Sequence, residues 1–155
     1  VANKPFYPLY VWWLVGNGVQ ASLWTLAAAP FFLAIPLIAR SHPLAARTAL
    51  PLVGAFDTIF ETKLFGQASG TEFFLAPCMM LAALAFRAEE KRWQRGLAVF
   101  LFCAMALQHG RLGEALHLWS NNDLSTLLGL NTFAVATLMT FIALRYAGIE
   151  RSKSS

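Results

Sequence analysis

Charged side chains stand between two apolar runs in the stretch 54–74, GAFDTIFETKLFGQASGTEFF. Asp57 and Glu61 are four residues apart, so on a helix they share one face. Ionisable groups are expensive inside a membrane, and they therefore face the protein interior or a wet cavity and pair with one another. If the flanking runs cross a membrane, these carboxylates need partners of opposite charge, and we expect Lys63 and Arg111 to supply them.

The composition is typical of a membrane protein. The chain has 155 residues, of which 57% are hydrophobic and 13% are charged, and its mean hydropathy is +0.54. A soluble domain of this size needs more charge to cover its surface. The net charge of +4 comes from basic residues in short loops between apolar runs, which indicates membrane orientation rather than nucleic-acid binding.

The apolar runs predict the fold. Several of them approach the ~20 residues that a spanning helix requires. We predict one all-α domain over residues 1–155, an integral membrane bundle of five transmembrane helices. An interfacial segment over residues 1–18, rich in Tyr and Trp, precedes spans at about residues 19–39, 48–64, 71–86, 96–116 and 124–144.

The distribution of basic residues predicts the orientation of these spans. Five spans place nine basic residues on one side of the membrane, namely Arg40, Arg47, Arg87, Lys91, Arg92, Arg95, Arg145, Arg151 and Lys153. The other side holds three, Lys4, Lys63 and Arg111. Because basic loops stay on the cytoplasmic side, we expect the C-terminus in the cytoplasm and the N-terminus outside. The expected location is a bacterial inner (plasma) membrane, with the lipid bilayer as the first partner.

Polar residues from different spans fall at similar depths. Counting about 1.5 Å per residue from the basic loops, Asp57 lies ~15 Å into the membrane, and four residues on four helices lie at ~21–22 Å, namely Glu61, Glu72, His109 and Asn131. Only thirteen residues, 96–108, precede His109 in the fourth apolar run, which is too few to cross. We therefore expect that helix to continue through Arg111 and Glu114 in the outer half of the membrane.

This layer predicts an outward-open polar pocket for a small ligand. The candidate ligand-binding residues are Asp57, Glu61, Glu72, His109, Arg111, Glu114 and Asn131, with Trp24 and Trp119, together with Phe60 and Phe73, as aromatic lining. No nucleophile motif or phosphate-binding loop occurs, so we assign no catalytic residue and favour a binding module over an enzyme. In the alternative interpretation the polar residues are structural, because buried ion pairs can set helix register and long side chains near an interface can reach water.

A membrane redox enzyme, dependent on a metal or a quinone, is the second functional class. Four residues carry ligand atoms that a hard or borderline cation accepts, namely Asp57, Glu61, Glu72 and His109, although no HExxH or ExxH pair occurs. Beside Trp24 and Trp119, His109 and Arg111 suit a quinone. A haem is disfavoured because His109 and His117 are eight residues apart and differ by ~80° around a helix. A proton-coupled transporter with Asp57 as carrier ranks lowest, because five spans have no matched inverted halves.

The run 64–74, LFGQASGTEFF, followed by Pro77 and a basic loop, resembles the multi-helix membrane sensor segments found ahead of bacterial cyclase and histidine-kinase domains. The resemblance covers about residues 44–105. It implies ligand sensing or membrane anchoring. A catalytic output domain follows the segment in those proteins, whereas this sequence ends at Ser155, so we expect any output to come from another membrane or signalling subunit.

Overall fold

The computed structural model describes the backbone of residues 6–153 and the side chains of residues 6–147. Helices make up most of this part of the chain, which contains no strand. The elements are α1 (Tyr7–Leu14), α2 (Val19–Leu23), η2 (Trp24–Ala28), α3 (Ala29–Ser41), α4 (Pro43–Phe65), η3 (Gln67–Ser69), η4 (Thr71–Phe74), α5 (Leu75–Leu84), η5 (Ala88–Glu90), α6 (Lys91–Gln108) and α7 (Asn121–Lys153), where η marks a 3₁₀ turn. The prediction of an all-α fold is confirmed.

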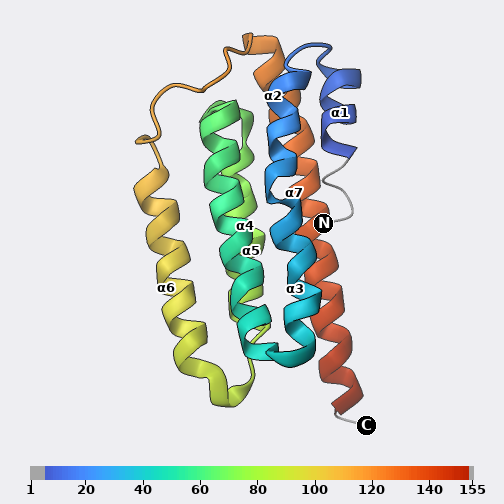
Figure 1. Cartoon of the computed structure of the whole chain (residues 1–155), viewed down its shortest axis with the longest axis vertical. Helices are drawn as coiled ribbons and strands as arrows, with labels where there is room; N and C mark the ends of the chain where they lie inside the picture. The colour runs from blue at the N-terminus through green and yellow to red at the C-terminus, as the bar shows by residue number, and fades with distance from the viewer. Residues whose placement is uncertain (1–5, 154–155) are drawn as a thin grey trace.

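The main helical segments lie side by side along the long axis of the molecule (Figure 1). They are the continuous α2–η2–α3 segment, α4, α5, α6 and α7, while the short α1 lies beside the start of α2. Two stretches are long and apolar enough to cross a membrane, Val19–Ser41 and Asn121–Ala147. The segments Thr71–Leu84 and Ala88–Gln108 pass the same test together, but they are bent by 114°. These properties are those of a membrane protein.

The boundaries of the fourth apolar helix differ from the prediction. The sequence predicts a helix over 96–116, whereas α6 begins at Lys91 and ends at Gln108. Residues 109–120 form an irregular loop, in which Gly110 and Gly113 have φ of +70° and +66°. Glycine adopts this left-handed conformation readily and commonly ends helices in it. The expectation that His109, Arg111 and Glu114 lie on a membrane helix is therefore wrong.

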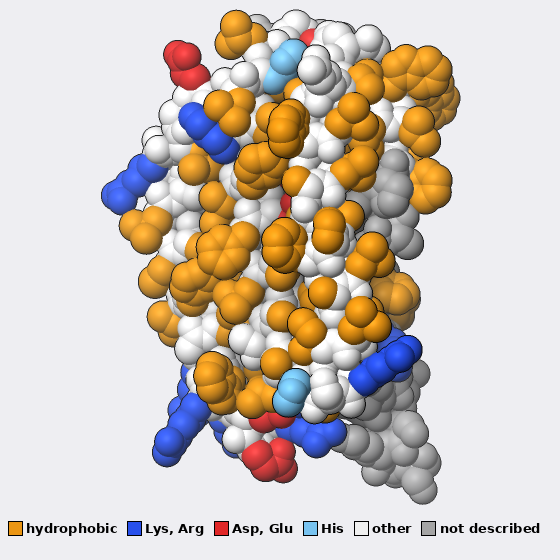
Figure 2. All heavy atoms as spheres, viewed as in Figure 1, with side chains coloured by type: hydrophobic (Ala, Val, Ile, Leu, Met, Phe, Trp, Pro, Cys, Tyr) orange, Lys and Arg blue, Asp and Glu red, His pale blue; other side chains and the backbone are white. Residues whose placement is uncertain are grey.

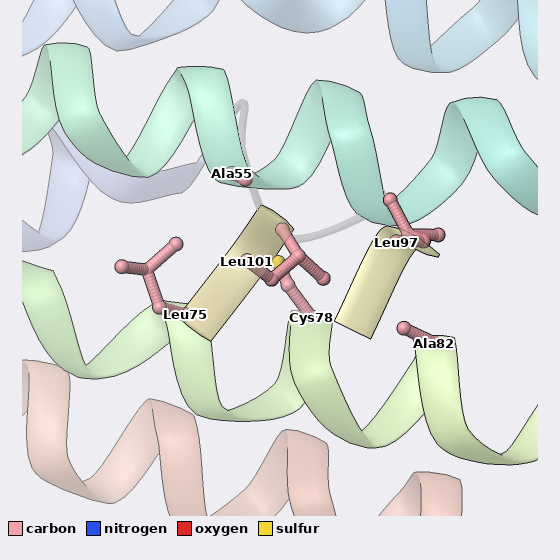
Figure 3. Packing of buried hydrophobic residues seen from close by; sticks show 6 residues of the cluster. All are labelled: Ala55, Leu75, Cys78, Ala82, Leu97 and Leu101. Atoms are coloured by element: carbon pink, nitrogen blue, oxygen red, sulfur yellow. The ribbon is translucent and has the colours of Figure 1, made fainter. Parts of the chain in front are cut away.

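One apolar core cluster lies between α4, α5 and α6 (Figure 3). Its buried members are Ala55, Leu75, Cys78, Ala82, Leu97 and Leu101. A Cβ atom at Gly54 would lie 2.7 Å from Sγ of Cys78, so α4 and α5 pack closely because position 54 has no side chain. Small residues permit such close approach where lipid offers no hydrophobic driving force between helices.

An ion pair ties α4 to the turn between α5 and α6. Arg47 Nη1 donates to the carboxylate of Glu90, and both side chains are largely shielded from solvent. The backbone N–H of Arg87 also donates to Glu90 Oε2, at 2.9 Å. These contacts, the Arg87 N–H foremost, hold the pKa of the Glu90 carboxyl below its ordinary value. We call the end of the bundle formed by residues 40–47 and 87–95 the basic end.

Replacing Glu90 by Gln is expected to lower the midpoint of thermal unfolding in detergent at neutral pH, because it removes the charge that Arg47 faces. Glu89→Gln, at an exposed neighbouring position, is the matched control. Because folding lowers the pKa of Glu90, its contribution is complete above pH 4.5, the ordinary value, and is lost as the pH falls through the lowered pKa. A difference between E90Q and wild type that persists unchanged in stronger acid would contradict this assignment.

Candidate functional site

A chain of buried hydrogen bonds joins four parts of the fold, and we call its members, Tyr7, Thr62, Ser69, Thr71 and Asn131, the polar core. Asn131 of α7 donates from Nδ2 to the carbonyl of Ser69 at 2.9 Å and accepts from the Tyr7 hydroxyl at 3.2 Å. The hydroxyls of Ser69 and Thr71 lie 3.1 Å apart. Thr71 in turn donates to Oγ1 of Thr62 at 3.3 Å. The polar core thus connects α1, α7, the α4–α5 turn and α4.

The α4–α5 turn explains why this polarity is needed. Gly66 and Gly70, with φ of +84° and +73°, reverse the chain through two 3₁₀ turns, and Ser69, Gly70 and Thr71 are buried. A buried backbone group without a partner costs free energy comparable to a lost hydrogen bond. The Asn131 amide satisfies the Ser69 carbonyl, so this residue, predicted as a ligand contact, is engaged within the fold.

The loop over residues 109–120 closes the C-terminal end of α4. The backbone N–H groups of Leu116 and His117 donate to the carbonyls of Lys63 and Leu64, at 3.0 and 3.4 Å. Such carbonyls have no partner inside their own helix. Lys63 Nζ donates to two loop carbonyls, at 2.8 and 2.7 Å. Lys63 was expected to pair with a carboxylate, and it holds the loop instead. We call this end of the bundle the loop end.

The remaining predicted residues make different contacts, and one of them, Glu61, interacts with Tyr7 of the polar core. His109 and Glu72 come together, with Nδ1 of His109 3.5 Å from Oε2 of Glu72, but the His109 side chain is 75% exposed. Asp57 interacts electrostatically with Cys78.

Arg111 and Glu114 are exposed in the loop. Throughout the described residues, no three His, Cys, Asp or Glu side chains are grouped so that they could hold a metal ion. The predicted layer of polar groups is therefore divided among several contacts and does not converge on one metal-sized site.

A groove of about 790 Å³ opens at the loop end, between α2–η2 and α4, and we call it the loop-end groove. It is lined by Gly18, Val19, Gln20, Ala21, Trp24, Ala27, Phe60, Leu64, Leu116 and His117. Trp24 and Phe60 were predicted to line a pocket, and they line this one. Gln20 and His117 were not predicted to line a pocket. His117 was considered only as a haem ligand, and residues 109–116 of the loop that carries it were predicted to be helical. The spacing of Gly110 and Gly113 was the available signal for that loop.

His117 has a defined setting at the edge of the loop-end groove. Its ring packs edge-on against Trp119, with ring centroids 4.5 Å apart, and Trp119 stacks on Phe65 at 5.3 Å. A Cβ atom at Gly18 would lie 2.2 Å from Cη2 of Trp119, so only glycine allows the chain to pass there. Trp119, predicted as pocket lining, thus packs against the His117 ring at the edge of the groove.

Asp123, at the start of α7, adds a charge to this setting. Its carboxylate accepts from Nδ2 of Asn17 at 3.0 Å and from the backbone N–H of Ser120 at 3.1 Å, and it interacts electrostatically with His117. Ser120 returns the contact, because its hydroxyl accepts from the Asp123 N–H at 3.2 Å. This reciprocal cap begins α7 and positions the loop that carries His117.

Comparison with protein-family models, curated proteins and solved structures finds no match for this chain.

Replacing Asn131 by Leu is expected to destabilise the fold by about 1–2 kcal/mol, because the Ser69 carbonyl and the Tyr7 hydroxyl both lose their partner. The measurement is equilibrium unfolding in mixed micelles, followed by circular dichroism. Thr132→Val, at the adjacent exposed position, is the control and should unfold like wild type. If the two variants are equally stable, the polar core does not hold the α4–α5 turn.

Proposed function

We propose that this chain is a multi-pass membrane protein that binds a small amphipathic molecule in the loop-end groove, and that it acts as a sensor or as an accessory subunit of a membrane complex. The observation that carries the proposal is the groove itself. Its volume of about 790 Å³ falls within the range of small-molecule sites, which is about 300–1,000 Å³. Sites of this kind combine an apolar wall with a few placed polar groups.

The composition of the lining supports an amphipathic ligand. Trp24, Phe60 and Leu64 provide an apolar wall, and the Trp24 side chain is 62% exposed, so it is accessible to a ligand. Gln20 and His117 offer hydrogen-bonding groups at the same groove. Among the described residues that line it, His117 has the one ionisable side chain, which favours recognition over multi-step acid–base chemistry.

The proposal includes five membrane crossings. α4 has 23 residues and is therefore about 34 Å long, enough to cross a hydrocarbon core of ~30 Å. A bend of 114° between the Thr71–Leu84 and Ala88–Gln108 segments reverses the direction of the chain, which favours a hairpin of two crossings over one broken span. With α2–α3 and α7, the total is five.

The proposed orientation follows from the charges at the two ends. On the face that Figure 2 shows, Lys and Arg side chains gather at the basic end, together with acidic ones, below hydrophobic side chains over the middle of that face. Other Lys and Arg side chains lie nearer the opposite end, at the upper left of the view. The positive-inside rule then assigns the basic end and the C-terminus to the cytoplasm of a bacterial inner membrane. The N-terminus and the loop-end groove would face outward. An outward groove on a helical bundle is consistent with the resemblance to membrane sensor segments.

Cysteine labelling in intact cells tests the five-span topology. In a variant with Cys78 and Cys103 replaced by Ser, we expect Ser120→Cys to react with a membrane-impermeant maleimide from outside. Ala88→Cys should react only after lysis. Both positions are exposed, so access depends on the side of the membrane. Labelling of both positions from the same side would contradict the proposed topology.

Binding can be tested with a short-chain alkyl quinone, an amphipathic probe that quenches tryptophan fluorescence. The full chain in phosphatidylcholine nanodiscs should show saturable quenching, much of it lost in Trp24→Phe. Ala27→Phe should block the loop-end groove. His117→Ala should weaken binding about tenfold by removing one hydrogen bond.

The controls are Ala39→Phe and His109→Ala, because Ala39 and His109 are exposed and lie outside the groove lining. Both controls should bind like wild type. Equal quenching in each variant and its control would show that the probe binds elsewhere.

A further inference from the structure

A second groove lies at the basic end, between the first turns of α4 and of α6. Its volume is about 400 Å³, and its lining consists of Leu44, Ala45, Thr48, Ala49, Leu52 and Trp93. Five of these residues follow one face of α4 at helical spacing. The Thr48 hydroxyl, the one polar group on that face, donates to the carbonyl of Leu44 at 3.0 Å. The groove therefore presents an apolar track along α4.

Positive charge surrounds the end of this track. The basic end carries six Lys or Arg side chains and two acidic ones in residues 40–47 and 87–95, an excess of four positive charges. Lys91, Arg92 and Arg95, which flank Trp93 on α6, are all exposed. Glu90 accepts from Arg47 and from the Arg87 N–H, so this carboxylate already has partners.

Trp93 marks the boundary between the apolar track and the charged region. Its side chain is 58% exposed although it lines the groove. Tryptophan rings are favoured at the level of lipid headgroups, where one edge is apolar and the other is wet. The groove therefore matches a phospholipid part by part. The apolar track corresponds to the acyl chain, Trp93 to the level of the headgroup, and the basic residues to the phosphate.

We propose that this groove binds an anionic phospholipid. One acyl chain lies along α4 from Ala45 to Leu52, and the phosphate lies among the basic side chains that begin α6. Charge complementarity indicates which lipid binds. The excess of positive charge attracts an anionic headgroup, whereas a zwitterionic headgroup has no net charge and is attracted less. Basic pockets between membrane helices on the cytoplasmic side bind anionic headgroups in this way. The proposal is independent of the loop-end groove.

Lipids with brominated acyl chains, which quench nearby tryptophan, provide the test. The full chain is placed in phosphatidylcholine nanodiscs that contain either brominated phosphatidylglycerol or brominated phosphatidylcholine. The Trp93 signal is the difference between wild type and Trp93→Phe. We expect phosphatidylglycerol to quench Trp93 at a lower mole fraction than phosphatidylcholine. In the R92Q/R95Q double variant this preference should fall about fivefold for each charge removed.

Two control experiments separate a lipid site from general surface charge. R111Q/R145Q removes the same number of charges from exposed positions away from the groove and should keep the preference. Ala45→Phe fills the apolar track at an exposed position and should weaken quenching of Trp93 by both lipids. Equal quenching by the two lipids in wild type, or an equal loss of preference in both double variants, would overturn the proposal.

Discussion

The backbone of the α4–α5 turn must find hydrogen-bond partners inside a largely apolar bundle, and much of the structure follows from this constraint. The turn carries two glycines in left-handed conformations and a run of buried residues, Ser69 to Thr71. Because Ser69 is buried, water does not reach its carbonyl, and a side chain from another helix donates to it instead. Asn131 reaches it from α7, and Tyr7 completes the amide's contacts from α1. The polar core thus docks α1 and α7 against the turn.

The same requirement shapes the loop end. α4 ends at Phe65, and its last carbonyls accept from the backbone of the loop over residues 109–120. Lys63 fastens that loop by donating to two of its carbonyls. Because the loop is held there, Leu116 and His117 come to the edge of a groove whose other wall is α2–η2. The loop-end groove, on which the proposed function rests, thus forms because the loop caps the C-terminal end of α4.

The two ends of the bundle use charge differently. At the basic end one ion pair, Arg47–Glu90, joins α4 to the α5–α6 turn, and further basic side chains remain exposed around a shallow apolar groove. At the loop end Lys63 donates to backbone carbonyls, and Nδ1 of His109 lies 3.5 Å from Oε2 of Glu72.

Sequence alone determined the helical class, the membrane character and the first span, because apolar run length and proline and glycine positions are local properties. It also singled out Asn131, Trp24 and Phe60 as candidate ligand-binding or pocket-lining residues. It predicted one polar cluster where the structure has several contacts, because depth along a helix can be counted from the sequence, whereas the rotation of each helix about its axis cannot. Only tertiary packing decided that Lys63 binds carbonyls and that His117 borders a groove. The partners in each case come from segments distant in sequence, and packing alone brings them within reach.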